Sequence, residues 1–532
     1  MSEPSAGRWF PTTWKSRLFV ALPWIGLIWV RFANPMGDHG SVNVFSYLLV
    51  ILSFLFWWLW FLIASGKSWK TKLLVTAVPA AAVFGFFSVF RIDRMSGEMI
   101  PTFALRSTPK SDQTLDVPSA KSTGAVDLLT ETADDFPQFL GPDGRQAVEH
   151  VRLDGDWQAR PPEELWRREI GSGWSGFAVR NGIAVTMEQR GDQELVTCYR
   201  LADGEPCWSY AHETRFESTI AGDGPRGTPF IVDGVVYSIG VHGMLTALDG
   251  ADGSLIWQRD LDQELGLEDK RLAVFPYGRS NSPLVVGDHL IVPYGGDPDG
   301  GYTSLLKVDR KTGETVWTAG DHQVSCASPV IAELGGVRQI VSVDAGRVAG
   351  YRYDDGEVLW SHPWPGRTEA DCNVSQPVPL ADDQVFVSKG YGQGAALLQL
   401  KANAGAFEVE ELWHFSRTLR TKFTNVSMLD GYAYGLSDGI LECVEVATGE
   451  RQWKKGRYRH GQMLRVSEHL LILSEDGEVF LVEATPERGN SVLGSFPALT
   501  GKTWNNLALY GDILLVRNAT EAAAFRLPLA SS

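Results

Sequence analysis

Hydrophobic positions follow two different patterns along this chain of 532 residues. Up to residue 91 they form three nearly continuous apolar runs, and from residue 136 onward they fall into many short runs separated by Gly, Asp and Asn. Runs of about 20 apolar residues are typical of helices that span a bilayer, and short runs bounded by turn residues are typical of strands. The pattern predicts three transmembrane helices, at about 17–32, 44–65 and 73–91, which contact the lipid bilayer through residues 17–91.

The first run is the shortest of the three, since Arg17 and Arg31 bound it closely. It can span a bilayer only if flanking Trp14, Lys15 and the arginines extend their polar ends to the headgroups. A cleavable signal peptide is the alternative for this run alone, but two further long runs follow it. Residues 1–95 are therefore assigned to a membrane anchor.

Charges in the short loops indicate the orientation of the anchor. Arg8, Lys15 and Arg17 precede the first run, and three lysines lie between the second and third runs, within residues 67–72. Lys and Arg are enriched in cytoplasmic loops. The N-terminus and the 67–72 loop are predicted to be cytoplasmic. Everything after residue 95 is then predicted to lie on the periplasmic side of the inner membrane of a bacterium.

Residues 96–135 are rich in Ser, Thr, Pro and acidic residues and show no sustained periodicity. This composition is typical of a flexible linker between a membrane and a folded domain. The groups of short apolar runs begin after the linker, so residues 136–532 are assigned to one domain.

A short pattern recurs in this domain: an Asp-Gly or Thr-Gly turn with a Trp four residues after the Gly. The five copies are Gly204/Trp208, Gly253/Trp257, Gly313/Trp317, Gly356/Trp360 and Gly449/Trp453. Such turns between apolar runs indicate hairpins, and a repeat of about 40–50 residues with four strands is typical of a β-propeller. A repeated position is a packing position, so these Trp residues are predicted to be structural, as are Trp166 and Trp413 at matching places.

The strands fall into eight groups between residues 176 and 528. The last group, 506–528, is one strand short, and residues 164–170 provide a spare strand upstream of the first group. Closing a ring with a strand from the other end of the domain removes an exposed edge. The predicted fold is an all-β eight-bladed propeller, with seven blades as the fallback, behind an N-terminal α-helical anchor of three transmembrane helices.

Composition narrows the range of functions. After residue 95 the chain has 39 Lys and Arg against 61 Asp and Glu, a net charge of −22, which argues against binding nucleic acid. The ten His and five Cys show no spacing typical of a zinc site, and no metal site is predicted. Cys198 and Cys207 flank one hairpin turn, where two buried thiols or a disulfide would fit.

The Gly-x-x-x-Trp repeat resembles that of the quinoprotein, or pyrroloquinoline-quinone-like, propellers, over roughly residues 136–528. Known members are either quinone-dependent alcohol and sugar dehydrogenases or cofactor-free periplasmic scaffolds of the BamB-like kind. The order of the chain, with helices first and the propeller after them, is similar to that of the membrane-bound sugar dehydrogenases. The compactness of the blades is more similar to that of the scaffolds. The repeat itself does not separate the two classes.

Function is expected where the repeats differ, in the eight segments that lead into the innermost strands, which we name the channel segments. They are residues 171–176, 224–229, 278–283, 325–329, 373–377, 421–425, 459–463 and 502–506. The ligand-binding candidates at this channel mouth are Trp174, Arg226, Arg279, Asn281, Gln376, Lys422, Asn425 and Trp504. A ring of cationic and amide side chains could bind a small anion. The alternative is that these side chains line a hydrated channel and bind only water.

A dehydrogenase of this kind requires a base and a calcium ion held by carboxylate oxygens. The channel segments contain no Asp or Glu, so no catalytic residue and no cofactor is predicted, although Trp174 and Trp504 could form one planar face for a quinone. The leading hypothesis is a binding or scaffolding platform with protein partners in the cell envelope, and an enzyme is less favoured. The alternative is a membrane-bound dehydrogenase that uses pyrroloquinoline quinone and calcium and passes electrons to membrane quinone.

Overall fold

A computed structural model describes residues 8–34, 38–118, 125–366, 372–403 and 406–531. The chain divides into two units, and each is described by itself. The first unit runs to Pro109 and also takes in Thr219–Gly222, whose Thr219 carbonyl accepts a hydrogen bond from the Met95 amide (3.1 Å). Its elements are α1 (Trp14–Ala33), α2 (His39–Ala64), α3 (Trp69–Val89), β1 (Phe90–Met95) and β2 (Pro101–Leu105).

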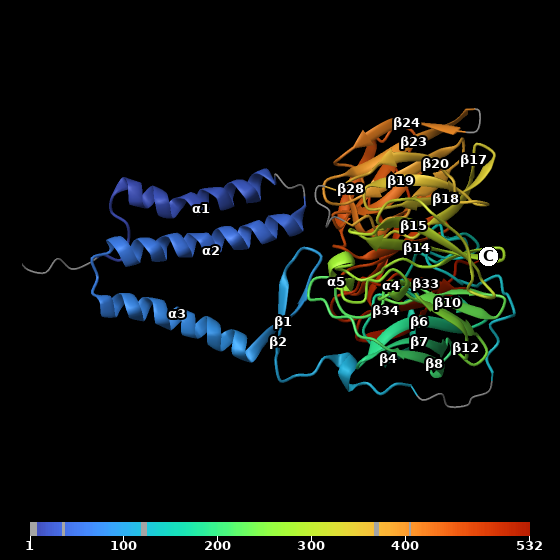
Figure 1. The fold of residues 1–532 in the computed structure, drawn as a ribbon, viewed down its shortest axis with the longest axis horizontal. Helices are drawn as coiled ribbons and strands as arrows, with labels where there is room; N and C mark the ends of the chain where they lie inside the picture. The colour runs from blue at the N-terminus through green and yellow to red at the C-terminus, as the bar shows by residue number, and fades with distance from the viewer. Residues whose placement is uncertain (1–7, 35–37, 119–124, 367–371, 404–405, 532) are drawn as a thin grey trace, which may run out of the picture. The chain divides into compact units, whose positions relative to one another are not determined.

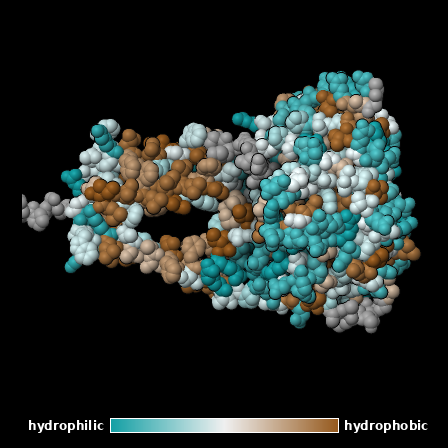
Figure 2. Space-filling model, viewed as in Figure 1, coloured by the Kyte–Doolittle hydropathy of each residue, from teal (hydrophilic) through white to brown (hydrophobic). Residues whose placement is uncertain are grey.

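Each of the three helices begins at a residue whose side chain caps it. Thr13, Asp38 and Ser68 accept hydrogen bonds from backbone N–H groups of the first turns of α1, α2 and α3. All three helices are long and apolar enough to cross a membrane, and they present brown, hydrophobic surfaces in Figure 2. Their bounds differ by a few residues from the predicted ones, mostly because the capping residues extend each helix at its N-terminal end.

The second unit is a β-propeller of eight sheets, which confirms the predicted fold and removes the seven-bladed fallback. Figure 1 shows the blades as successive sheets. Blade one consists of β5 (Ala178–Arg180), β6 (Ile183–Arg190), β7 (Gln193–Arg200) and β8 (Pro206–Glu213), and blade two of β9 (Phe230–Val232), β10 (Val235–Ile239), β11 (Met244–Asp249) and β12 (Leu255–Asp260). Blade three consists of β13 (Leu284–Val286), β14 (His289–Asp297), β15 (Gly301–Asp309) and β16 (Thr315–Ala319), and blade four of β17 (Val330–Leu334), β18 (Val337–Val343), β19 (Arg347–Arg352) and β20 (Val358–Pro363).

Blades five to eight follow in chain order. Blade five consists of β21 (Val378–Leu380), β22 (Gln384–Lys389), β23 (Gly394–Asn403) and β24 (Ala406–Phe415), and blade six of β25 (Thr421–Leu429), β26 (Tyr432–Ser437), β27 (Ile440–Glu445) and β28 (Arg451–Arg457). Blade seven consists of β29 (Gln462–Val466), β30 (His469–Leu473), β31 (Glu478–Glu483) and β32 (Val492–Pro497), and blade eight of β33 (Ala508–Tyr510), β34 (Ile513–Arg517), β35 (Glu521–Arg526) and β4 (Glu163–Glu169). The short strand β3 (Ala147–Val148) adds to the inner side of β29, and two single-turn helices, α4 (Leu261–Glu264) and α5 (Arg271–Val274), follow β12.

The motif Gly and Trp join neighbouring blades. A Cβ at Gly253 would lie 2.5 Å from the Trp208 ring of the preceding blade, so only glycine, at φ +76°, fits that contact. The Trp208 indole N–H donates to the carbonyl of Gly250, also in the next blade (2.9 Å). Equivalent contacts to the next blade are made by Trp166, Trp257, Trp317, Trp413 and Trp453.

Blade five departs from this arrangement. Its outer strands β23 and β24 are ten residues long, and Val409 stands four residues before Trp413, where the repeat has Gly. The indole N–H of Trp360 in blade four donates to the side-chain oxygen of Gln339 in its own blade (2.7 Å). One deviation in the repeat thus redirects the Trp that would have joined the two blades.

Strand β4 completes the last blade, as the spare strand predicts. It pairs antiparallel with β35, with Trp166 opposite Ala524. The Trp166 ring covers Gly204 of blade one, and its indole N–H donates to the carbonyl of Leu201 (2.7 Å). The N-terminal end of the domain therefore closes the ring.

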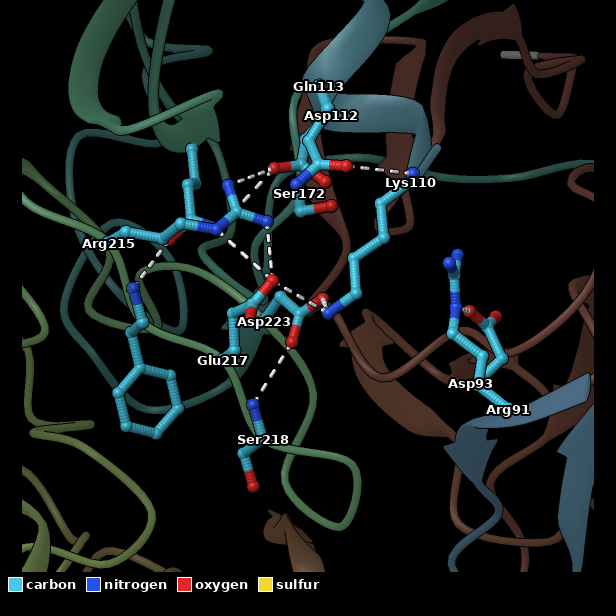
Figure 3. A network of polar contacts seen from close by, with 12 residues as sticks. Arg91, Asp93, Lys110, Asp112, Gln113, Ser172, Arg215, Glu217, Ser218 and Asp223 are labelled. Carbon is cyan, nitrogen blue, oxygen red and sulfur yellow. Dashed lines mark hydrogen bonds and ion pairs between the residues drawn. The ribbon is translucent and has the colours of Figure 1, made fainter. Parts of the chain in front are cut away.

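The stretch 96–135, expected to be a flexible linker, contains ordered structure where it is described. It holds β2, a 3₁₀ turn η1 (Ser111–Thr114) and Leu128, which is buried in the core of blades one and two. Figure 3 shows why the turn is fixed: the buried Asp112 carboxylate accepts from Arg215 (2.7 Å), and Lys110 contacts Asp223 (2.7 Å). Composition alone missed these ion pairs because their partners lie about 100 residues away.

All five cysteines are thiols in this structure. Cys198 and Cys207, for which a disulfide was the alternative, lie on β7 and β8 with their thiols in contact. Both are buried, and burial raises the pKa of the Cys198 thiol well above its usual range.

Candidate functional site

The channel segments meet around the axis of the propeller and are joined by side-chain hydrogen bonds. The amide of Gly176 donates to Thr228 Oγ1 (3.1 Å), that of Thr228 to Ser282 Oγ (3.0 Å), and that of Ser282 to Ser328 Oγ (2.8 Å). In each of these three pairs, the later segment supplies an acceptor to the backbone of the segment before it. Many small polar residues of these segments therefore hold the ring together.

Two of the three predicted amide ligands take part in this ring. Asn281 donates to the carbonyls of Ser325 (3.0 Å) and Ala327 (2.6 Å), and Asn425 Oδ1 accepts from the amide of Gln376 (2.8 Å). The side-chain oxygen of Gln376 is different: it is buried and makes no hydrogen bond within the described chain. Of the three amides, Gln376 is therefore the best placed to bind a ligand.

Arg279 lies in a buried ion pair. Its guanidinium donates to Asp262 Oδ1 from Nε (2.9 Å) and from Nη2 (2.7 Å), and both side chains are almost fully buried. Asp262 belongs to α4, 17 residues upstream of Arg279. This carboxylate was not predicted as a partner, because it lies outside the channel segments. The pair explains Arg279 without a ligand.

The other predicted cations lie over aromatic rings. Arg226 is 4.7 Å from the ring centre of Phe216 and donates to the carbonyl of Gly224 (2.6 Å), and burial lowers its pKa to about 10. Lys422 lies 5.2 Å from the Tyr391 ring centre. Cation–π contacts of this kind hold a charge in place and shield part of it from water.

Trp174 and Trp504 come together as predicted, with ring centres 5.2 Å apart, but their planes are tilted by 43°. Trp504 also lies 4.8 Å from Phe423, and the Lys502 ammonium is 3.8 Å from the Trp504 ring centre. The result is an aromatic cluster covered by a cation. A tilted pair offers a wedge-shaped contact surface and not the single flat face that the quinone hypothesis requires.

Two buried carboxylates outside the channel segments reach the mouth. Glu475 Oε1 accepts from the indole N–H of Trp504 (3.0 Å). Glu194 accepts from the amide of Val241 (3.0 Å), and burial raises its pKa to about 7 despite that bond and the nearby charge of Arg226. A carboxyl with a pKa near neutrality can act as a base, and no pattern around Glu194 in the sequence marks it.

These carboxylates do not fit calcium and a quinone cofactor. Calcium takes six to eight oxygen ligands, usually from several carboxylates together. In the residues that the structure describes, no group of three or more His, Cys, Asp or Glu side chains could hold a metal ion. Glu475 and Asp262 are each bound to groups of the protein itself.

A cavity of about 440 Å³ lies further along the channel, between blades three to six and the loop 138–146. Gln376 and Asn425 line it, as does Gln146, whose buried side-chain oxygen also makes no hydrogen bond within the described chain. A cavity of this size with two amide acceptors suits a small polar molecule that can donate hydrogen bonds.

Comparison with known proteins identifies the repeat. A family model described as "Outer membrane protein assembly factor BamB" matches residues 157–296 and 192–455, which together exceed half of the chain. The outer membrane protein assembly factor BamB of Salmonella typhimurium is 28% identical over 145 residues, 26% of this chain and 31% of that protein. The dehydrogenase subunit of a quinone alcohol dehydrogenase from Gluconacetobacter polyoxogenes is 31% identical over 133 residues, 24% of this chain and 15% of that protein.

The alignments thus span a third or less of either relative. Among solved structures, the quinohemoprotein alcohol dehydrogenase of Comamonas testosteroni superposes with a TM-score of 0.53 at 11% identity, covering 79% of this chain and 84% of that one. This likeness concerns the fold alone. The repeat, the eight-bladed ring and the family match agree, and the chain belongs to the BamB-like family of pyrroloquinoline-quinone-type repeat propellers.

Proposed function

We propose that this protein is a membrane-anchored binding platform whose propeller docks other proteins of the cell envelope on the periplasmic side of the inner membrane. The observation that carries the proposal is the outer hairpin of blade five, the blade that departs from the repeat. The Salmonella relative is named an assembly factor for outer membrane proteins, which supports protein partners of the envelope.

Strand β24 is the longest outermost strand of the eight blades, and within the described chain no further strand pairs with its outer edge. Figure 1 shows it at the rim of the propeller. Its residues alternate: Phe407 and Val409 pack against the core cluster shared by blades four and five, whereas Glu408 and Glu410 are exposed. A long open edge with backbone groups available is a docking site for another strand.

The chemistry of the edge indicates the partner. Glu408, Glu410 and Glu411 make it acidic, and Leu412 remains 41% exposed beside them. Glu410 pairs with Lys401 (2.5 Å) and Glu411 contacts His362 (3.2 Å), so Glu408 carries the least balanced charge of the three. An extended segment with Lys or Arg and one or two apolar side chains matches this edge when it adds to the sheet as a further strand. The proposed partner is therefore an envelope protein with such a basic, extended segment.

Photocrosslinking in living cells tests this function with a matched control. Leu412 directly precedes Trp413 on β24, just as Ile256 directly precedes Trp257 on β12, and Ile256 is 48% exposed. A photoreactive amino acid at residue 412 is expected to give a discrete crosslinked partner, and the same probe at residue 256 is expected to give none. Changing Glu408 and Glu410 to Lys should reduce the yield at residue 412 at least about fivefold, since the charges then repel.

Equal crosslinking at both positions, or a yield that does not respond to the charge reversal, would contradict docking at β24. Peptide mapping of the crosslinked product identifies whether the captured segment is basic. A captured segment without Lys or Arg would also count against the proposed chemistry.

The proposed orientation leads to a separate prediction. Alkaline phosphatase, which is active only outside the cytoplasm, should be active when fused after residue 135 and inactive when fused at Ser68. The reason is the excess of Lys and Arg in the N-terminal segment and in residues 67–72. The reverse pair of activities would overturn the orientation.

A further inference from the structure

Two cysteines from neighbouring blades meet at the channel mouth. Cys326 lies in the channel segment of blade four, and Cys372 directly precedes that of blade five. The backbone amide of Cys326 donates to the carbonyl of Asn373 (2.9 Å), and the amide of Asn373 donates to Ser325 Oγ (2.7 Å). These two bonds fix the segments side by side, which brings the two thiols into contact.

The surroundings of this pair favour a thiolate. The hydrogen bond from Cys372, a second one from Ser280 and the positive charges of Arg226 and Lys389 together hold the pKa of Cys326 below its usual range. Both residues are partly exposed, and the pKa of Cys326 is lowered although burial of its thiol acts in the opposite direction. A partly exposed cysteine with a depressed pKa among cations is the reactive kind, and a partner thiol within contact can complete a disulfide.

We infer that Cys326 and Cys372 form a redox-active dithiol at the channel mouth, which closes to a disulfide by exchange with an oxidant that itself carries a disulfide. First, the Cys326 thiolate attacks one sulfur of the oxidant, forms a mixed disulfide and releases the other sulfur. The Cys372 thiolate then attacks Cys326 Sγ and releases the remaining sulfur of the oxidant. Two electrons and two protons pass from the cysteine pair to the oxidant, which leaves as two thiols.

The disulfide would join the channel segments of blades four and five covalently. The hydrogen bonds at Asn373 already hold these segments together, so closure requires no separation or rearrangement of blades. The inference is independent of docking at β24, because it rests on a different part of the propeller.

The other three cysteines serve as controls within the same chain. Cys198 and Cys207 are also in contact, and the contact with Cys198 lowers the pKa of Cys207, but both residues are buried and the pKa of Cys198 is raised. Cys443 is buried, and burial raises its pKa to about 12. These three thiols are expected to stay unreactive in the folded protein, although they are chemically the same group.

The test uses the full-length protein in detergent with oxidised glutathione as the oxidant, followed by unfolding, alkylation and mass spectrometry. The wild type is expected to lose two thiols, keep three and carry no glutathione, with a peptide that joins residues 326 and 372. Cys372→Ser should retain one glutathione on Cys326, since the resolving thiol is missing. Cys326→Ser should react about tenfold more slowly, because it lacks the activated thiol.

Three results would overturn the inference. They are a disulfide between Cys198 and Cys207, a glutathione adduct that persists on wild-type Cys326, and no reaction under conditions that oxidise the unfolded chain. The wild-type result requires no variant, so it stands even if a substitution impairs folding. Cys372→Ala provides a second version of the resolving-thiol variant.

Discussion

A chain that begins at residue 172 is expected not to form a stable propeller, whereas one that begins at residue 110 is expected to fold. The shorter chain lacks β4, so β35 loses its partner and Gly204 loses the Trp166 ring that covers it. An open ring then exposes both an unpaired edge and part of the largest hydrophobic core cluster. Solubility and urea unfolding of the two purified chains measure the difference.

The shorter chain also loses Phe136, Val148 and Trp157 from that cluster, so the truncation does not measure the effect of losing β4 alone. A point variant in β4 tests the contribution of this strand separately. Trp166→Ala in the longer chain should lower the free energy of unfolding by about 3 kcal/mol, the lower end for removing a core Trp, since Trp166 is half-buried. Equal unfolding midpoints for Trp166→Ala and the unmodified chain would contradict closure by β4.

Asp262→Ala is expected to lower the free energy of unfolding by about 3–5 kcal/mol, because it leaves the Arg279 guanidinium buried without its carboxylate. The double variant Asp262→Leu, Arg279→Met should be less destabilised than Asp262→Ala, since it removes both charges together. Urea unfolding of the chain that begins at residue 110 gives both values.

The comparison of these unfolding free energies shows whether Arg279 belongs to a buried ion pair or serves a ligand in the channel. If Arg279 is part of the buried pair, Asp262→Leu and Arg279→Met are strongly coupled in a double-mutant cycle that includes both single variants. If Arg279 instead served a ligand in the channel, Asp262→Ala would cost little stability, and the effects of the two substitutions would add.

The repeat made most of the fold predictable, since its two residue types have definite structural roles. A Gly such as Gly253 allows a turn with positive φ, and a Trp such as Trp208 provides a large ring that packs against a residue without a side chain. The spacing of Trp166 and Trp413 carried the same information into blades without the Gly turn. The sequence did not show that each Gly packs against the Trp of the preceding blade, because that contact depends on how blades stack.

The candidate site was less predictable, for a physical reason. The channel segments were identified correctly as neighbours, but their polar groups are paired with residues from other parts of the chain. Asp262 balances the charge of Arg279, and Glu475 accepts a hydrogen bond from the indole N–H of Trp504. Likewise, Asp112 is fixed by Arg215, about 100 residues away. Composition cannot identify such partners, because tertiary folding brings them together.

We propose that the propeller binds proteins and does not act as a quinone-dependent dehydrogenase. In the direct experiment, the chain that begins at residue 110 is titrated with pyrroloquinoline quinone and calcium in a calorimeter, and dye reduction with alcohols and aldoses is then measured. The expected result is no binding at low micromolar concentration and no turnover. The described residues offer no cluster of ligands for calcium, and without a metal and a base each step loses about 10²-fold or more. Stoichiometric binding with substrate-dependent dye reduction would contradict the account.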